Sequence, residues 1–250
     1  MIIRERDDAF VMIEQNHHAT LSGQLYDHIS QHIKLEEEIN HLAVREAIYL
    51  HDIGWSPFDL SPIWNDENAR PYDFITYPNT IKTVLYQYGI NKVAETNDYA
   101  TLLCSEHYTR FLENDSHPLS QQFVKKERKR QKALINSFSS FNQDTFLTHY
   151  EIFQFFDNFS LYICLHETNA TPDDIHYFFK RGIALPALYG GGKLNSSWEE
   201  QTILLDRTLF QESITIKLQQ KVVSKRQIKE EGLQKAWNNT DVELVPIKLK

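Results

Sequence analysis

The segment from Glu151 to His166 constrains the fold more than any other part of the sequence. Between those two residues it is almost entirely apolar, and Asp157 is its only acidic or basic residue apart from Tyr162 and the weakly acidic Cys164. Burying an isolated carboxylate is very costly, so such a group is neutralised, paired with a cation or bound to a metal ion. We therefore expect other helices to surround this segment and to help satisfy Asp157.

A second polar feature, the pair His51-Asp52, ends a helix expected over residues 35–50. The periodicity places apolar side chains of that helix toward the interior, and these are Ile39, Leu42, Val44, Ala47 and Ile48. The helix is expected to end near Gly54. Neighbouring helix residues point about 100° apart, so His51 and Asp52 flank a wedge in which an ion can sit. We interpret Asp157 as a further ligand of that ion.

The first expected helix, over residues 17–33, supplies another inward histidine. His18 shares an apolar stripe with Leu21, Leu25 and Ile29, whereas His17 falls on a polar face. Gly23 is unfavourable inside a helix, which indicates that another helix approaches closely there. His107 shares a stripe with Leu103 and Phe111 and is the fourth inward candidate. A core histidine bound only by hydrogen bonds is the competing interpretation for it.

The order of the expected elements indicates a mainly α protein, a helical bundle with a small β-sheet. Further helices are expected over residues 80–89, 93–113, 118–137, 144–166 and 172–179. A strand interrupted at Asp7-Asp8 is expected over 2–13, and later strands over 201–205, 213–218 and 242–249, with a short helix at 229–237. We expect one domain over 1–250, with a helical body at 14–188 and a β appendage formed by 1–13 and 195–250.

Composition narrows the functional classes. The net charge of -8 argues against broad attraction to nucleic acid or anionic membranes. No run approaches the roughly 20 apolar residues needed to cross a bilayer, so we expect a cytoplasmic protein without a membrane partner. Cys104 and Cys164 lie in apolar segments outside any Cys-x-x-Cys pair, which favours core positions over a disulfide or a thiolate metal site. The sequence leaves open whether the chain forms a homo-oligomer.

The order His18, His51-Asp52 and Asp157 resembles that of the HD superfamily of metal-dependent phosphohydrolases. The Ile-Gly after the pair is also found in that superfamily, but Trp55 stands where a lysine often follows. Over most of the chain, the segments His-His-Ala-Thr-Leu-Ser-Gly-Gln-Leu, His-Asp-Ile-Gly-Trp, Ser-Glu-His-Tyr and Phe-Asp-Asn-Phe-Ser-Leu look more closely like an uncharacterised bacterial domain-of-unknown-function family. The wider resemblance implies an HD-type helical bundle.

Two imidazoles and two carboxylates suit a divalent transition metal, and Mn, Fe, Co, Ni and Zn all remain open. We expect one ion, with a second near His107 as the alternative. The metal ligands are then His18, His51, Asp52 and Asp157, and a metal-activated water would hydrolyse a nucleotide or another small phosphorylated molecule.

The remaining roles rest on weaker signals. Asp52 is assigned a catalytic role at the metal, and Glu106 or Asp59 is assigned as general base. His107, Arg110 and Trp55 are assigned to substrate binding. For Glu106, Asp59 and Arg110, a solvated charge is the competing interpretation.

Two further hypotheses stay open at the level of sequence. A non-catalytic ligand-sensing or scaffold protein would keep the metal or its polar cluster for structure. Nucleic-acid binding would use the basic run at residues 125–132, although a solvated helix is the default interpretation. The run from Gly190 to Lys193 is not a phosphate-binding loop, because Ala187 and Leu194 occupy positions where that motif needs Gly and Ser or Thr.

Overall fold

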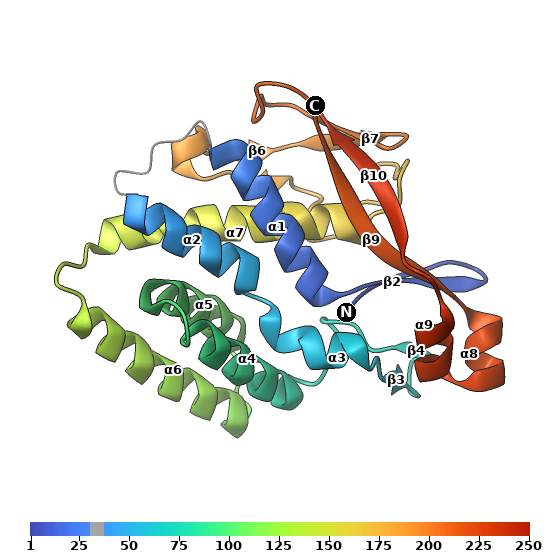
Figure 1. Cartoon of the computed structure of the whole chain (residues 1–250), viewed down its shortest axis with the longest axis horizontal. Helices are drawn as coiled ribbons and strands as arrows, with labels where there is room; N and C mark the ends of the chain where they lie inside the picture. The colour runs from blue at the N-terminus through green and yellow to red at the C-terminus, as the bar shows by residue number, and fades with distance from the viewer. Residues whose placement is uncertain (31–37) are drawn as a thin grey trace.

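A computed structural model describes residues 1–30 and 38–250, and it combines a helical body with a six-stranded sheet. Figure 1 shows α2, α4, α5 and α6 on the left and the long strands β9 and β10 on the right, with α8 and α9 beside the strands. Residues 31–37 lie outside the described residues. The expected C-terminal end of the helix at 17–33 and the expected start of the helix at 35–50 both fall there. Within the described residues, no helix is long and apolar enough to span a membrane.

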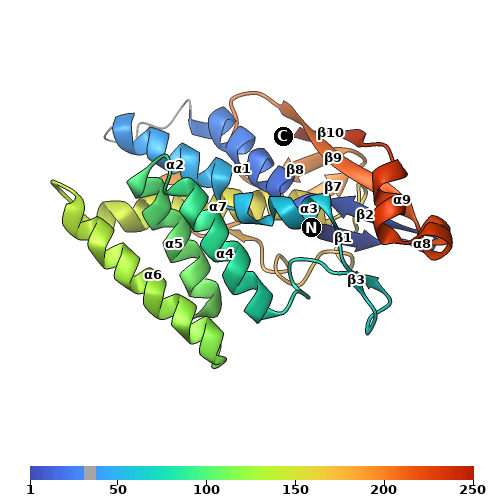
Figure 2. The ribbon, with the colours of Figure 1, turned by 60° about the horizontal axis from the view of Figure 1, so that its bottom comes forward.

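The helical body contains the helices expected up to residue 166, with shifted ends. The N-terminal pair is α1 (Gln15–Ser30) and α2 (Glu38–Leu50), followed by a short 3₁₀ helix η1 (Ile53–Trp55) and α3 (Ser56–Leu60). The later helices are α4 (Asn79–Val93), α5 (Asp98–Leu112), α6 (Pro118–Ser137) and α7 (Gln143–Leu165). Figure 2 shows α4, α5 and α6 side by side as one layer of this body.

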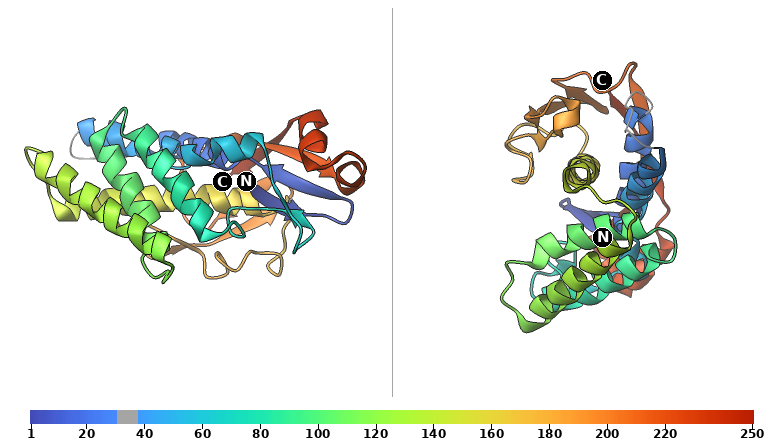
Figure 3. Two further views of the ribbon diagram at one scale, coloured as in Figure 1. Left: turned by 90° about the horizontal axis from the view of Figure 1, so that it is seen from below. Right: turned by 90° about the vertical axis from the view of Figure 1, so that its left-hand side faces the viewer.

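Helix α7 occupies the centre of the molecule, as its apolar sequence predicts. Seen end-on in the right panel of Figure 3, it is surrounded by other elements. Phe153, Phe156 and Phe159 have no exposed surface, and they belong to one core cluster with residues of α1, α2 and α5. A helix that is hydrophobic on all faces is stable in water only when it is covered on all sides, so the rest of the fold is organised around α7.

The sheet joins the two ends of the chain and is larger than the small appendage expected. Its strand order is β1-β2-β9-β10-β8-β7. The strands are β1 (Ile2–Glu5), β2 (Ala9–Ile13), β7 (Ser196–Glu199), β8 (Thr202–Leu205), β9 (Ile214–Ser224) and β10 (Glu243–Leu249). Only β8 and β10 pair in parallel among these neighbours, and β9 links the N-terminal hairpin to the C-terminal strands. The predicted participation of the N-terminal strand is confirmed.

Several local expectations were wrong. Residues 172–179 form turns instead of a helix, and Leu42 is largely exposed although its periodicity favoured the interior. The helix expected at 229–237 is divided into α8 (Lys225–Glu231) and α9 (Leu233–Asn239) by Gly232, whose φ of +83° is incompatible with a continuous helix. Between Trp55 and Pro78 the chain forms α3 and the short strands β3 (Trp64–Asn65) and β4 (Arg70–Pro71).

Two glycines allow helices to approach closely near the His-Asp pair. A Cβ at Gly23 would lie 2.3 Å from the ring of Tyr49 on α2, so the close approach predicted there is confirmed. A Cβ at Gly54 would lie 2.3 Å from the carbonyl oxygen of Leu85 on α4. The glycine two residues after Asp52 therefore lets α4 pack directly on the turn that presents the pair. The run Gly190–Gly192 has positive φ at each residue and lies in a turn between η2 (Ala187–Tyr189) and β6 (Lys193–Leu194), which pairs with β5 (Ile183–Ala184).

Candidate metal centre

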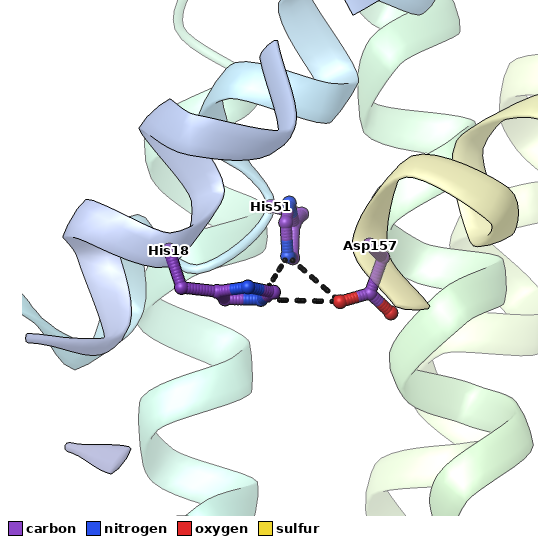
Figure 4. A group of neighbouring side chains, drawn as sticks. All are labelled: His18, His51 and Asp157. Carbon is purple, nitrogen blue, oxygen red and sulfur yellow. Dashed lines mark hydrogen bonds and ion pairs between the residues drawn. The ribbon is translucent and has the colours of Figure 1, made fainter. Parts of the chain in front are cut away.

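Three elements bring the predicted metal ligands together. His18 lies on the first turn of α1, His51 directly follows α2, and Asp157 lies in the middle of α7. Figure 4 shows the side chains of these three residues pointing toward one another. One potential ligand atom from each lies within 4.8 Å of the other two, and all three residues are buried. Three of the predicted ligands, spread over almost 140 residues of chain, therefore lie in one buried group that could hold a metal ion.

The separations within the cluster are those of atoms that share one ion. The His18 and His51 Nε2 atoms are 3.2 Å apart, and Asp157 Oδ1 lies 3.1 Å from the first and 3.4 Å from the second. Asp52 Oδ2 lies 3.4 Å from His18 Nε2 and 3.6 Å from His51 Nε2. Metal–ligand bonds of about 2.0–2.2 Å place adjacent donor atoms roughly 3 Å apart. His18, His51 and Asp157 thus form one group that could hold an ion, whereas the fourth predicted ligand, Asp52, lies beside the two histidines and outside this group of three.

The outer nitrogens of the two histidines are held by other groups. His51 Nδ1 lies 2.8 Å from the carbonyl oxygen of Ile48, which can only accept, so Nδ1 carries the hydrogen. His18 Nδ1 lies 2.6 Å from the Ser160 hydroxyl, which is also placed to donate to the Asp157 carbonyl. His18 Nδ1 can then donate to Ser160. In their neutral forms both rings present the Nε2 lone pair to the cluster, as metal-binding histidines do.

Asp52 is fixed by two residues outside the ligand set. Gln15 Nε2 donates to its Oδ2 at 2.8 Å, and the Tyr108 hydroxyl lies 2.7 Å from its Oδ1. The Tyr108 hydroxyl also contacts the His51 carbonyl, and its ring stacks on Tyr86 with centroids 4.0 Å apart. These contacts orient the carboxylate because they restrain both of its oxygens.

The pKa values of the cluster residues show how strongly their charges depend on one another. Burial by itself would lower the pKa of His51, but Asp52 and Asp157 outweigh it and raise this pKa to about 9. Burial opposes ionisation of Asp52 as well, yet His51 and His18 lower its pKa to about 2. The pKa of Asp157 is also lowered, against its burial, by the same two histidines. Two carboxylates therefore require positive charge between them, which a proton or a metal ion can supply.

His107 stands at the edge of this cluster, on α5. Its Nε2 lies 3.7 Å from Asp157 Oδ2, and its buried Nδ1 has no hydrogen-bond partner among the described residues. Burial lowers its pKa to about 4, against the attraction of Asp157. The ring packs on Phe111 and Phe153, with centroids 4.5 and 4.8 Å away. The predicted inward orientation is confirmed, and the residue keeps a free polar atom for another group.

The other predicted site residues are engaged elsewhere. Glu106 forms ion pairs with Arg110, at 2.7 Å, and with Arg128 on α6. Asp59 accepts from the backbone N–H of Asn16 at 2.9 Å and lies 3.0 Å from the amino group of Met1. Trp55 is buried in a separate aromatic cluster with Tyr77 and Tyr86. These contacts leave the base and substrate roles of Glu106, Asp59 and Trp55 as predictions.

Arg110 and an unpredicted tyrosine lie together beside His107. The Arg110 guanidinium lies over the Tyr150 ring, 4.2 Å from its centroid, and Tyr150 stacks on Phe153. Within the part of the chain that the structure describes, the buried Tyr150 hydroxyl has no hydrogen-bond partner. Burial raises the pKa of Tyr150 above its usual value, so this hydroxyl stays protonated and can donate. Arg110 keeps part of its side chain exposed, and its role in substrate binding stays a prediction.

Several residues of the site escaped sequence analysis. Gln15, Tyr108 and Ser160 carry no chemical signature in the sequence, because their roles depend on which ligand lies opposite them. Ser160 had the clearest available signal, since it lies three residues after Asp157 and therefore on the same helix face. His17 was expected on a polar face, but it is buried against the sheet, where its Nε2 accepts from the Gln219 N–H at 3.0 Å.

The fold and the site define a helical protein that holds a buried His-His-Asp group where three helices meet. Residues 1–225 match the family described as "Protein of unknown function (DUF3891)", and the chain belongs to that family. No curated protein and no solved structure matches the chain. The expectation of an uncharacterised family is thereby confirmed, and the wider resemblance to the HD superfamily stays a prediction.

Proposed function

We propose that the protein is a metal-dependent phosphohydrolase that acts on a nucleotide or another small phosphoester. The observation that carries this proposal is the convergence of His18, His51 and Asp157 from three different elements, with Asp52 beside both histidines. The order of these residues along the chain resembles that of HD phosphohydrolases. The proposal includes an HD-type architecture, for which the central position of α7 and its carboxylate is the support.

The donor set fits a divalent transition metal. It offers two carboxylates and two imidazole nitrogens whose lone pairs face inward. Among the described residues, no lysine or arginine lies within ion-pair distance of those carboxylates. Such an ion would supply Lewis-acid chemistry, which makes water nucleophilic at neutral pH and polarises a phosphoryl oxygen. His18, His51, Asp52 and Asp157 would hold it, and Ser160, Gln15 and the Ile48 carbonyl would keep the ligands oriented.

Three side chains next to the cluster would receive the phosphoryl group. The Tyr150 hydroxyl has no partner among the described residues and can donate to an oxygen of the substrate, while His107 places its ring at the edge of the cluster. Arg110 adds a positive charge that is already oriented by Glu106 and the Tyr150 ring. A phosphoester would then satisfy the Tyr150 hydroxyl and pair with Arg110, which favours an anionic substrate at this place.

The decisive experiment combines metal analysis with a substrate screen. Protein purified without chelator is analysed for bound metals, reloaded with Mn, Fe, Co, Ni or Zn, and assayed with nucleotides and 4-nitrophenyl phosphate. Asp157→Asn is the test variant, and Asp144→Asn is the matched control because Asp144 is exposed on the first turn of the same helix. We expect metal-dependent release of phosphate that the test variant loses and the control retains. A wild-type protein that retains no metal under any of these conditions overturns the proposal.

A non-catalytic metal-containing protein is the second candidate, and a specific observation favours it. The two carboxylates predicted as general bases, Glu106 and Asp59, are both occupied by positively charged partners. A sensor or scaffold of this kind would bind metal without turning over any phosphoester. Asp52→Ala would then lower the melting temperature, whereas the wild type would remain inactive throughout the substrate screen.

A further inference from the structure

The exposed side of α6 carries lysines that no acidic side chain balances. Among the residues that the structure describes, these lysines form no ion pair, whereas the one acidic residue of the helix, Glu127, has no exposed surface and pairs with Arg130. The outer surface of α6 is therefore positive, although the whole chain has a net charge of -8. We call this surface the lysine face, and it consists of Lys125, Lys126, Lys129 and Lys132.

The two arginines of α6 have a different role. Arg128 pairs with Glu106 on α5 and with Glu113, directly after that helix. Arg130 donates to the side chain of Asn91 on α4 at 2.7 Å. Both arginines thus attach α6 to the neighbouring helices, and their charges are compensated there. The lysine face is left to a partner outside the described chain.

The geometry of the lysine face suits a long, narrow partner. Lys125, Lys129 and Lys132 are separated by four and then three residues, so they form one row along the helix. At 1.5 Å per residue this row is about 10 Å long. Helix α6 lies at the outer edge of its layer in Figure 2 and in the left panel of Figure 3. A rod-shaped partner can follow this edge without covering the rest of the acidic molecule.

The composition of the helix indicates which polyanion fits. Within the described residues 120–137, no large apolar side chain is exposed. Protein interfaces use aromatic anchors and are depleted in lysine, and helices that lie on membranes insert an apolar face. Single-stranded nucleic acid is held largely by stacking on aromatic side chains. A duplex needs only cations and polar groups, because its backbone carries one negative charge per about 1.7 Å.

We propose that the lysine face of α6 binds the phosphate backbone of a double-stranded nucleic acid without reading its sequence. The ammonium groups contact phosphate oxygens, and the exposed amides of Gln122 and Asn136 extend the row at its two ends. The negative net charge of the molecule limits this attraction to one edge, so we expect a Kd of about 10–100 µM at physiological salt. The proposal does not depend on catalysis at the metal centre.

Fluorescence anisotropy of a labelled duplex of about 20 base pairs, titrated with the full-length protein, tests the proposal. Between about 50 and 200 mM salt, log K should fall against log salt with a slope of about -3 to -4, because each neutralised phosphate contributes about -0.9. The single strand, polyglutamate and phosphatidylserine vesicles are titrated in parallel and should bind more weakly. Equal or tighter binding of any of the three, or no binding of the duplex at about 50 mM salt, overturns the proposal.

The test variant replaces the row of lysines by Lys125→Gln, Lys129→Gln and Lys132→Gln. Glutamine keeps the helix propensity, so circular dichroism and metal content should not change. We expect at least about 20-fold weaker binding of the duplex at low salt and a slope near -1, since one lysine of the face remains. Lys129→Gln alone should reduce the slope by about 1.

The matched control removes the same number of charges elsewhere, by Lys193→Gln, Lys217→Gln and Lys229→Gln. All three lysines are exposed and lie outside α6. This control should bind the duplex within about threefold of the wild type and keep its salt slope. If the two triple variants weaken binding equally, the net charge determines the affinity and the lysine face is not the binding surface.

Discussion

Two clusters of buried carboxylates in this protein differ in the positive groups that compensate their charges. At the metal centre, Asp52 and Asp157 face two histidines, and the described contacts include no lysine or arginine. Between α5 and α6, by contrast, Glu106 pairs with Arg110 and Arg128, and Glu127 pairs with Arg130. The second cluster contains its own cations, whereas the first depends on a proton or a bound ion. Burial alone therefore does not distinguish the two clusters, and the difference lies in the charges that compensate the carboxylates.

The largest effect on metal binding is expected when a carboxylate is removed from the candidate metal centre. Asp157→Asn deletes a negative charge and a ligand while keeping the shape of the side chain. We expect metal content to fall from about one ion per chain to nearly none, and any phosphohydrolase activity to fall at least about 100-fold. Metal analysis after gel filtration measures the first effect. If this variant retains metal as well as the wild type does, the ion is not bound where the cluster places it.

A smaller loss of metal affinity is expected when a residue that orients a ligand is changed and the ligands themselves are kept. Ser160→Ala removes the hydroxyl that orients His18 but leaves all four ligands in place. Metal affinity should fall about 10- to 100-fold, the usual cost of losing such an outer contact. Ser137→Ala, at the exposed end of α6, is the matched control and should bind metal normally. Competition with a fluorescent chelator measures both variants, and equal affinities would show that Ser160 does not position His18.

Sequence analysis located the buried His-His-Asp group better than the residues around it, and the reason is physical. His18, His51 and Asp157 each interrupt an apolar helical face, so each one is anomalous within its own segment. Gln15 and Tyr108 are ordinary residues locally, and only the folded chain shows that both contact Asp52. The main helices were predicted for the same reason, because the apolar spacing of a helix is visible within its own segment.

The parts of the fold that were missed depend on contacts distant in sequence. The sheet proved larger than expected because β9 pairs on both sides, with β2 from the N-terminus and with β10. The pattern of a strand indicates which face is buried but not which strand lies next to it. The burial of His17 against β9 has the same origin, since nothing within α1 shows that the sheet covers its second face.

Competition between protons and metal at His51 predicts a pH dependence. In the metal-free protein the pKa of His51 is raised to about 9. The stability that its protonation contributes is complete below its unfolded value, near 6.5, and is lost as pH rises through about 9. Metal must displace this proton, so its affinity should increase about tenfold per pH unit between pH 7 and pH 8.5. Isothermal titration calorimetry in buffers with different protonation enthalpies counts the released protons, and no release would contradict the argument.

The smallest effect on stability is expected at the ion-pair cluster between α5 and α6, which contains its own cations. Glu106→Gln leaves Arg110 and Arg128 without their shared carboxylate, but both arginines are partly exposed and can be solvated. We therefore expect a stability loss of only about 1 kcal/mol in chemical denaturation, with unchanged metal content.

The same variant decides whether the two clusters are functionally separate. If Glu106 acts only through its ion pairs, kcat should change less than about threefold, because the residue does not move a proton in the reaction. If Glu106 is the general base, kcat should fall about 100-fold or more while metal binding stays intact. Only that second result would join the α5–α6 cluster to the chemistry of the metal centre, and it would mean that one of the arginines moves away when substrate binds.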